Sequence, residues 1–125
     1  MGFTAFSSGV LAKQADTGDA GVALVNGTPV IITWTAPNDG NLHAFTVIGG
    51  THVTLAETGG AIHAAWTTPD GAAASAGTDP GGRAAGGQGW TSVSGTTGPG
   101  ETLTVSQSSA LTAGAATAWA QIYGA

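Results

Sequence analysis

Short runs in which apolar and polar residues alternate, each bounded by glycine, proline or asparagine, constrain the fold of this chain more than any other feature. Residues 29–36 (PVIITWTA), 101–107 (ETLTVSQ) and 116–123 (ATAWAQIY) follow this period of two, and helical periodicity is nearly absent. Such runs predict β-strands separated by glycine-rich turns. Roughly seven to nine short strands of this kind predict an all-β chain, folded as an antiparallel and jelly-roll-like β-sandwich.

The dipeptide Asn26-Gly27 separates two of the predicted strands. The runs on either side of it are residues 21–25 (GVALV) and 29–36. Asn-Gly between two apolar runs is a strong signal for a tight hairpin turn. We therefore expect these two runs to be joined by a turn at this dipeptide.

Residues 42–66 are predicted to form a meander of three strands, with two-residue turns at Gly49-Gly50 and Gly59-Gly60. The apolar residues of the three strands share one face of the sheet only if the numbers of two paired residues sum to an odd value. Two-residue turns at these positions give this register. Ala44 then pairs with Leu55, and Leu55 pairs with Ala64. The side chains expected in the core are Leu42, Ala44, Ile48, Val53, Leu55, Ile62, Ala64 and Trp66.

The last predicted strand has one face of small and aliphatic residues and one aromatic face. Ala116, Ala118, Ala120 and Ile122 form the first face, and Trp119, Gln121 and Tyr123 form the second. If the second face is exposed, its Trp–Tyr stripe is an unusual surface patch that predicts an interface. The alternatives are that both faces are buried, or that the alanine face is the outer one.

The chain divides into a short arm and one domain. Residues 1–8, which contain Phe3 and Phe6 among small polar residues, are predicted to be a flexible arm, and residues 9–125 a single β-sandwich. Within the domain, residues 70–89 are rich in glycine and alanine and show no strand pattern, which predicts a long loop. We expect this loop to pack across a subunit boundary, with Arg83 anchored to a carboxylate or carbonyl there. The alternative is a loop that is mobile everywhere.

The charge content excludes several partners. Only 7% of the residues are charged, against about 25% in an ordinary domain, and the net charge is −5. Because Lys13 and Arg83 are the only lysine and arginine of the chain, neither nucleic acid nor an anionic membrane is an expected partner. No apolar run approaches the roughly 18 residues of a membrane-spanning helix, and the first residues do not resemble a signal peptide.

No motif of catalysis or cofactor binding survives inspection. The chain has no Gly-x-Ser-x-Gly motif and no phosphate-binding loop, its acids are scattered through predicted turns, and we expect neither an enzyme nor a cofactor. In the predicted register His43 and His63 lie on either side of Ala56, opposite the core and about 10 Å apart. This spacing disfavours a shared metal ion and favours surface or interface histidines.

The chain as a whole resembles the small capsid decoration (cement) proteins of tailed bacteriophages. The resemblance rests on a cysteine-free, acidic, Thr/Gly/Ala-rich β-sandwich sequence, an aromatic arm, and the ending PGETLTVSQSSALTAGAATAWAQIYGA. It implies a virion protein on the outer capsid surface, made in the host cytoplasm, commonly trimeric, that bridges major capsid proteins. The composition suggests an actinobacterial host. The side chains expected to contact partners are Phe3, Phe6, Arg83, Trp119, Gln121, Tyr123, His43 and His63.

Two other classes of function stay open at this point. One is a β-sandwich tail, receptor-binding or carbohydrate-binding module of a virion, which would use the aromatic face of the last strand. Gln121 is the one obvious hydrogen-bonding partner beside that face. The other is a small hydrolase or metal-dependent enzyme built around the histidines.

Overall fold

The computed structural model describes residues 11–27, 30–67, 73–79 and 83–125, and in these residues the protein is entirely β. The described part contains no helix long and apolar enough to cross a lipid bilayer. Its nine strands are β1 (Ala12–Asp16), β2 (Val22–Ala23), β3 (Val30–Thr35), β4 (His43–Thr58), β5 (Ile62–Thr67), β6 (Ala73–Asp79), β7 (Gln88–Thr97), β8 (Thr102–Gln107) and β9 (Ala113–Gly124). The predicted fold class, an antiparallel β-sandwich, is confirmed.

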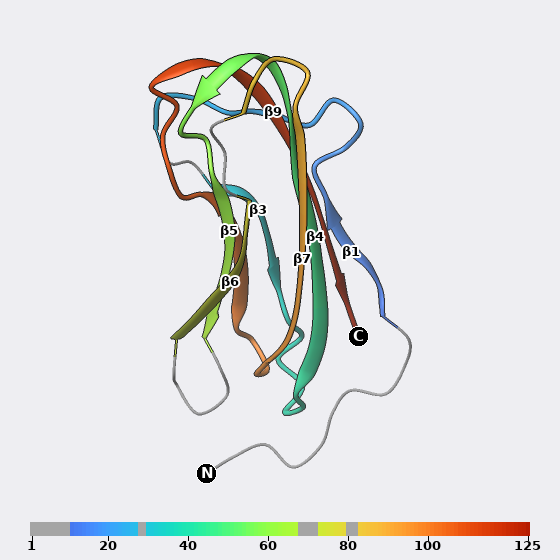
Figure 1. Cartoon of the computed structure of the whole chain (residues 1–125). Helices are drawn as coiled ribbons and strands as arrows, with labels where there is room; N and C mark the ends of the chain where they lie inside the picture. Colours follow the sequence, from blue (N-terminus) through green and yellow to red (C-terminus); the bar gives the residue numbers. More distant parts are fainter. Residues whose placement is uncertain (1–10, 28–29, 68–72, 80–82) are drawn as a thin grey trace.

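The strands form two sheets. One has the order β1-β9-β4-β7, with β2 also paired to β9, and the other has the order β3-β8-β5-β6. Figure 1 shows β3, β5 and β6 in one layer and β1, β4 and β7 in the other. The predicted hairpin around Asn26-Gly27 is wrong, because β2 pairs with β9 in one sheet and β3 pairs with β8 in the other. The chain crosses between the layers at this point instead of folding back.

The core lies between the two sheets and has two clusters. The first joins β4 and β9 to β8, and the second joins the same two strands to β5 and to the segments before β3 and β9. Alternate residues of β8 and β9 face inward, as their sequence pattern predicted. The buried members are Phe45, Val47, Leu103, Val105, Ala120 and Ile122 in the first cluster and Leu24, Val53, Ile62, Leu111, Ala116 and Ala118 in the second.

Strand β4 overturns the predicted meander. It runs for 16 residues without a turn at Gly49-Gly50, and it pairs with β7 on one side and β9 on the other. The turn at Gly59-Gly60 exists, with both glycines at positive φ, but it carries the chain into the other sheet. Neither of the predicted pairs, Ala44 with Leu55 and Leu55 with Ala64, is formed.

The missing turn also reverses the predicted faces of the first half of β4. Phe45 and Val47 are buried, whereas Ile48, which was expected in the core, is 40% exposed. Leu55, also expected in the core, is 63% exposed for another reason: the register of β4 with β9 shifts between Val53, which is buried as predicted, and Leu55. The side-chain period of a strand is two, so a register wrong by one residue moves every side chain to the opposite face. Both faces of this strand carry apolar residues, and the larger Phe45 is the one that the core takes.

The segment 70–89 is not a single long loop. Residues Ala73–Asp79 form β6, which pairs with β5, and Gln88 already belongs to β7. A segment composed mostly of alanine, serine and glycine shows no apolar alternation, so its sequence does not indicate a strand. Strand pairing itself requires only hydrogen bonds between backbone N–H and C=O groups. The residues just before β7 are tied to β4 by backbone bonds, from Gly86 N to Val53 O (2.7 Å) and from Val53 N to Gly87 O (2.9 Å).

Replacing Gly49 with alanine tests the continuity of β4. A Cβ atom at Gly49 would meet the Cδ1 atom of Ile62 at 3.4 Å and the Cβ atom of Ala120 at 3.9 Å. Because Gly49 is not among the glycines at positive φ, alanine should leave the free energy of unfolding unchanged or raise it by up to about 1 kcal/mol. Urea denaturation measures this change. A loss of about 1 kcal/mol or more would instead support a tight turn at this dipeptide.

Candidate functional site

The aromatic face of β9 lies on the outside of the five-stranded sheet. Trp119, Gln121 and Tyr123 are partly buried and alternate with the fully buried Ala118, Ala120 and Ile122. The predicted division of this strand into two faces is therefore confirmed. The alternative in which the alanine face is the outer one is excluded, because these alanines pack in the core.

A hollow of about 540 Å³ opens on this outer face beside Trp119 and Gln121. It extends from the turn after β1 across β9 and β4 to the start of β7, where Gln88 lines it. The backbone register explains its position, because Gly50 pairs with Trp119 and has Ile48 and His52 on either side of it on the same face of β4. Since Gly50 has no side chain, the sheet surface is low between Ile48 and His52.

The turn after β1 forms one wall of the hollow and holds Trp119 in place. The indole Nε1–H of Trp119 donates to the backbone oxygen of Asp19 (2.8 Å). A Cβ atom on Gly21, whose φ is +67°, would lie 2.8 Å from this Nε1 atom and 2.7 Å from the carbonyl oxygen of Ala118. Only glycine lets the turn approach β9 this closely, so Gly21 sets the position of the ring.

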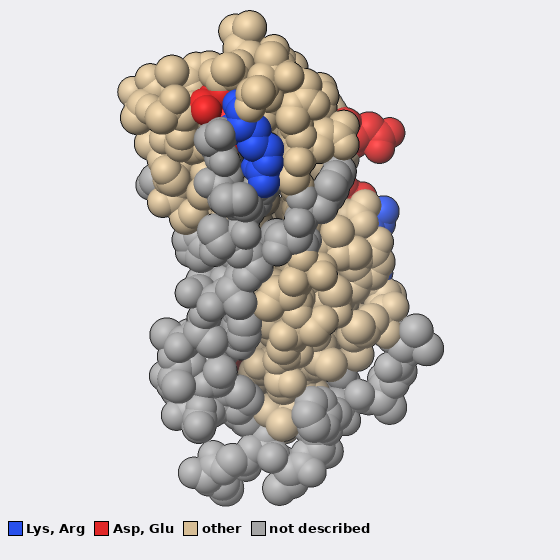
Figure 2. Space-filling view, viewed as in Figure 1, with Lys and Arg blue, Asp and Glu red and all other residues tan. Residues whose placement is uncertain are grey.

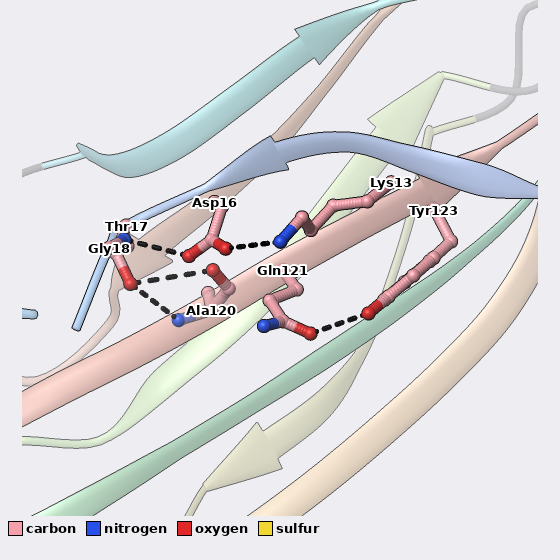
Figure 3. A network of polar contacts seen from close by, with 7 residues as sticks. All are labelled: Lys13, Asp16, Thr17, Gly18, Ala120, Gln121 and Tyr123. Atoms are coloured by element: carbon pink, nitrogen blue, oxygen red, sulfur yellow. Dashed lines mark hydrogen bonds and ion pairs between the residues drawn. The ribbon is translucent and has the colours of Figure 1, made fainter.

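Polar contacts fasten the same turn to β9, as Figure 3 shows. The Thr17 hydroxyl accepts a hydrogen bond from the backbone N–H of Ala120 (3.1 Å), and Thr17 N donates to Ala120 O (3.1 Å). The Asp16 carboxylate accepts from Gly18 N (2.7 Å) and forms an ion pair with Lys13 (2.9 Å). The bond from Lys13 and then the bond from Gly18 lower the pKa of Asp16, so this carboxylate is charged and already occupied.

Other polar groups at the hollow keep their hydrogen-bonding capacity. The hydroxyl of Tyr123 donates to Gln121 Oε1 (2.7 Å), which orients the amide of Gln121. Within the described part of the chain, no hydrogen bond uses the Nε2 group of Gln121, the carboxylate of Asp19, or the side chains of His52 and Gln88. The hollow therefore combines one aromatic ring with donors and acceptors from three strands and a turn.

His43 lies in the core, contrary to the prediction that it faces outward. Its side chain is 1% exposed, packs edge-on against Trp34, and bonds through Nε2 to Asp39 Oδ1 (2.9 Å) and through Nδ1 to the carbonyl oxygen of Ala125. Both partners are oxygen acceptors, so the protonated ring, with a proton on each nitrogen, satisfies both contacts.

The predicted arrangement of His43 and His63 on either side of Ala56 is also wrong. His43 belongs to β4, whereas His63 belongs to β5 of the other sheet, where its backbone pairs with Ser106. The side chain of His63 lies outside the described residues. The prediction assumed that His43 and His63 lie in the same sheet, and they do not.

The ion pair of His43 predicts how stability depends on pH. Burial acts to lower the pKa of His43, but the bonds to Ala125 and Asp39 outweigh it and raise the pKa above 6.5. The stabilisation is complete below about pH 6.5 and is lost as the pH rises through the raised pKa of the folded protein. Melting temperatures should therefore fall as the pH rises above about 6.5, and His43→Gln should remove this slope. A wild-type melting temperature that stays flat or rises over this range would contradict the assignment.

The remaining predicted partner residues are Arg83, Phe3 and Phe6. Arg83 is partly buried, donates to Thr51 Oγ1 (3.2 Å), and lies against Gly89, where a Cβ atom would overlap its guanidinium group. Arg83 thus contacts β4 and β7 of its own chain, and its predicted contact with a neighbouring subunit stays a prediction. Phe3 and Phe6 lie outside the described residues.

Of the residues that line the hollow, Trp119 and Gln121 were identified from the sequence as site residues, and seven were not. These seven are Asp16, Gly18, Asp19, Ile48, His52, Gln88 and Ala120. For Ile48, His52 and Gln88 the signal is proximity to Trp119 across the sheet, which requires the register of β4 and β7 against β9. No protein-family model, no curated protein and no solved structure matches this chain.

Proposed function

We propose that this protein decorates and stabilises the outer surface of a phage capsid. It bridges major capsid proteins, acts as a homotrimer, and is made in the host cytoplasm before it joins the virion. The resemblance of the whole sequence to small decoration proteins first suggested this role. Two features of the described surface support it.

The first supporting feature is the low charge of the surface. In the view of Figure 2 the described atoms are mostly uncharged, with few blue or red side chains among them. The chain has only two Lys or Arg residues and seven Asp or Glu residues. Few ionic groups then need to lose water when broad faces pack between subunits, so the cost of desolvation is low.

The second feature, and the one that carries the proposal, is an exposed apolar pair on the five-stranded sheet. Leu55 pairs with Ala115 and is 63% exposed. Val25 lies just after β2, two residues beyond the last pair of β2 with β9, and is 46% exposed. Exposed aliphatic side chains on a charge-poor surface are typical of a protein interface.

The strand order supports a jelly roll as part of the same proposal. Four strands in the order β1-β9-β4-β7 face four in the order β3-β8-β5-β6, and the chain changes sheet at most of its connections. Double-sheet jelly rolls recur in viral capsid domains and in lectins. One fold can carry many functions, so the jelly-roll strand order supports the decoration role only in combination with the surface features.

Capsid binding tests the proposal directly. The purified protein is mixed at saturating concentration with undecorated capsids of the phage that encodes it, and the particles are imaged. Density at symmetric lattice positions is expected, together with a trimer mass by sedimentation or light scattering. Capsids that carry no added density at saturation would refute the decoration role.

A charge introduced at Leu55 tests whether the apolar pair forms the interface. Leu55→Asp should weaken capsid binding or trimer formation by about tenfold or more, because a carboxylate would be buried without a partner. Val30→Asp is the matched control, since Val30 is 57% exposed on β3 of the other sheet. Wild-type occupancy by the Leu55→Asp protein would remove this pair from the interface.

A further inference from the structure

We propose that the hollow beside Trp119 binds a neutral pyranose glycan. This proposal is separate from the capsid-binding role and rests on the outer face of β9, β4 and β7 and on the turn after β1. The hollow has about 540 Å³, which lies within the range of roughly 300–1,000 Å³ found for small-molecule sites. Its lining supplies the two things that a sugar ring needs, an apolar platform and hydrogen-bonding groups spread around it.

The platform is the indole of Trp119. Its N–H is bonded to Asp19 O and its position is fixed by the turn at Gly21, so the ring is rigid before any ligand arrives. A rigid aromatic ring supplies large contact area at a low cost in conformational entropy. The C–H face of a pyranose is apolar and flat enough to stack on such a ring.

The hydrogen-bonding groups lie around the ring at the spacing of the sheet. Gln121 is two residues from Trp119 along β9, about 7 Å away, and His52 and Gln88 pair with each other on the two neighbouring strands, about 5 Å apart. An amide offers both donors and an acceptor, and the carboxylate of Asp19 offers acceptors only. These groups match the paired donor and acceptor character of neighbouring sugar hydroxyls.

The same lining argues against other small ligands. Anionic ligands such as phosphates and acidic sugars would meet Asp16 and Asp19, and Lys13, the nearby base, is already paired with Asp16. Cation recognition by aromatic side chains typically uses a cage of several rings. Trp119 is the single aromatic residue among the described residues that line the hollow. A neutral, polyhydroxylated ligand fits this combination best.

Titration with neutral saccharides tests the proposal on the full-length protein. The probes are methyl glycosides of glucose, galactose and mannose and the trimer of N-acetylglucosamine, each followed by calorimetry and by saturation-transfer NMR at millimolar concentrations. Saturable binding of at least one probe is expected. Trp119→Ala should weaken it by about tenfold or more, and Gln88→Ala by about threefold to tenfold.

The controls separate a binding role from a structural one. Gln88 is exposed, so Gln88→Ala keeps the test valid even if Trp119→Ala disturbs the sheet. Val30→Ala, on the other sheet, should bind like the wild type. Absence of binding to every probe, equal binding by the wild type and both hollow variants, or binding of choline instead of the saccharides would overturn the proposal. Capsid occupancy should be unchanged by Gln88→Ala, so the two proposed roles fail independently.

Discussion

Replacing Phe45 with alanine is expected to lower the free energy of unfolding by about 3–5 kcal/mol. Phe45 is 1% exposed and belongs to the core cluster that joins β4 to β8 and β9. Removing its ring leaves a cavity between two sheets, and paired sheets cannot collapse locally to fill it. Urea denaturation followed by tryptophan fluorescence measures the change.

Ile48 provides the matched control on the same strand. It lies three residues further along β4 and is 40% exposed on the opposite face. Ile48→Ala should therefore cost about 1 kcal/mol or less. The sequence alternation had placed Ile48 in the core, so the two variants distinguish the two registers. A larger loss for Ile48→Ala than for Phe45→Ala would show that the faces of β4 are assigned the wrong way round.

Gly59→Ala is expected to destabilise the protein by about 2–4 kcal/mol. Gly59 has a φ of +83°, and a Cβ atom there would overlap the backbone carbonyl oxygen of Ala110. The variant therefore combines a left-handed backbone penalty of about 1–2 kcal/mol with an overlap that only a shift of backbone can relieve. Thermal and urea denaturation report the sum.

Gly40→Ala isolates the backbone part of that cost. Gly40 has a φ of +79°, and nothing lies within 4 Å of the position of its Cβ atom. This variant should lose only about 1–2 kcal/mol. Equal losses for Gly40→Ala and Gly59→Ala would mean that Ala110 does not limit the connection between β4 and β5.

Alternation predicted the strands that have one clearly apolar face. In β8, Leu103 and Val105 face the core and the threonines face out. In β9 the side chains that face the core are Ala116, Ala118, Ala120 and Ile122. The fold class followed from these strands and from the absence of helical periodicity. Where one face of a strand is apolar and the other is polar, only the apolar face can be buried at low cost, so the alternation in the sequence shows which face is in the core.

For strand β4 the same reasoning gave the wrong faces, because both faces of this strand carry apolar and polar residues. Its inner face includes His43 and Thr51, and its outer face includes Ile48 and Leu55. The polar inner residues are satisfied in part by contacts from distant parts of the chain, such as the carbonyl of Ala125 for His43 and the guanidinium group of Arg83 for Thr51. Such partners are known only once the sheets are assembled, so the pattern alone misplaces these residues.

The candidate site was predicted in part. Trp119, Gln121 and Tyr123 were identified from one strand, since their common face depends only on local alternation. The hollow beside them depends on Gly50, which the sequence indicated as part of a turn. A glycine pair signals a turn or a place where the strand lacks side chains, and only the register of β4 with β9 shows that the second applies here.

The position of β9 in the five-stranded sheet has a consequence for how the protein forms. This strand lies between β4 and β1 and also pairs with β2, although about fifty residues separate it from β4 and nearly one hundred from β1. During synthesis, β1 and β4 therefore lack the strand that joins them until residues 113–124 leave the ribosome. Until then, Phe45 and Val53 also lack the β9 side chains that cover them in the core. We therefore expect closure of the sandwich to be late and non-local, with a rate limited by the search that brings residues 113–124 to β1 and β4.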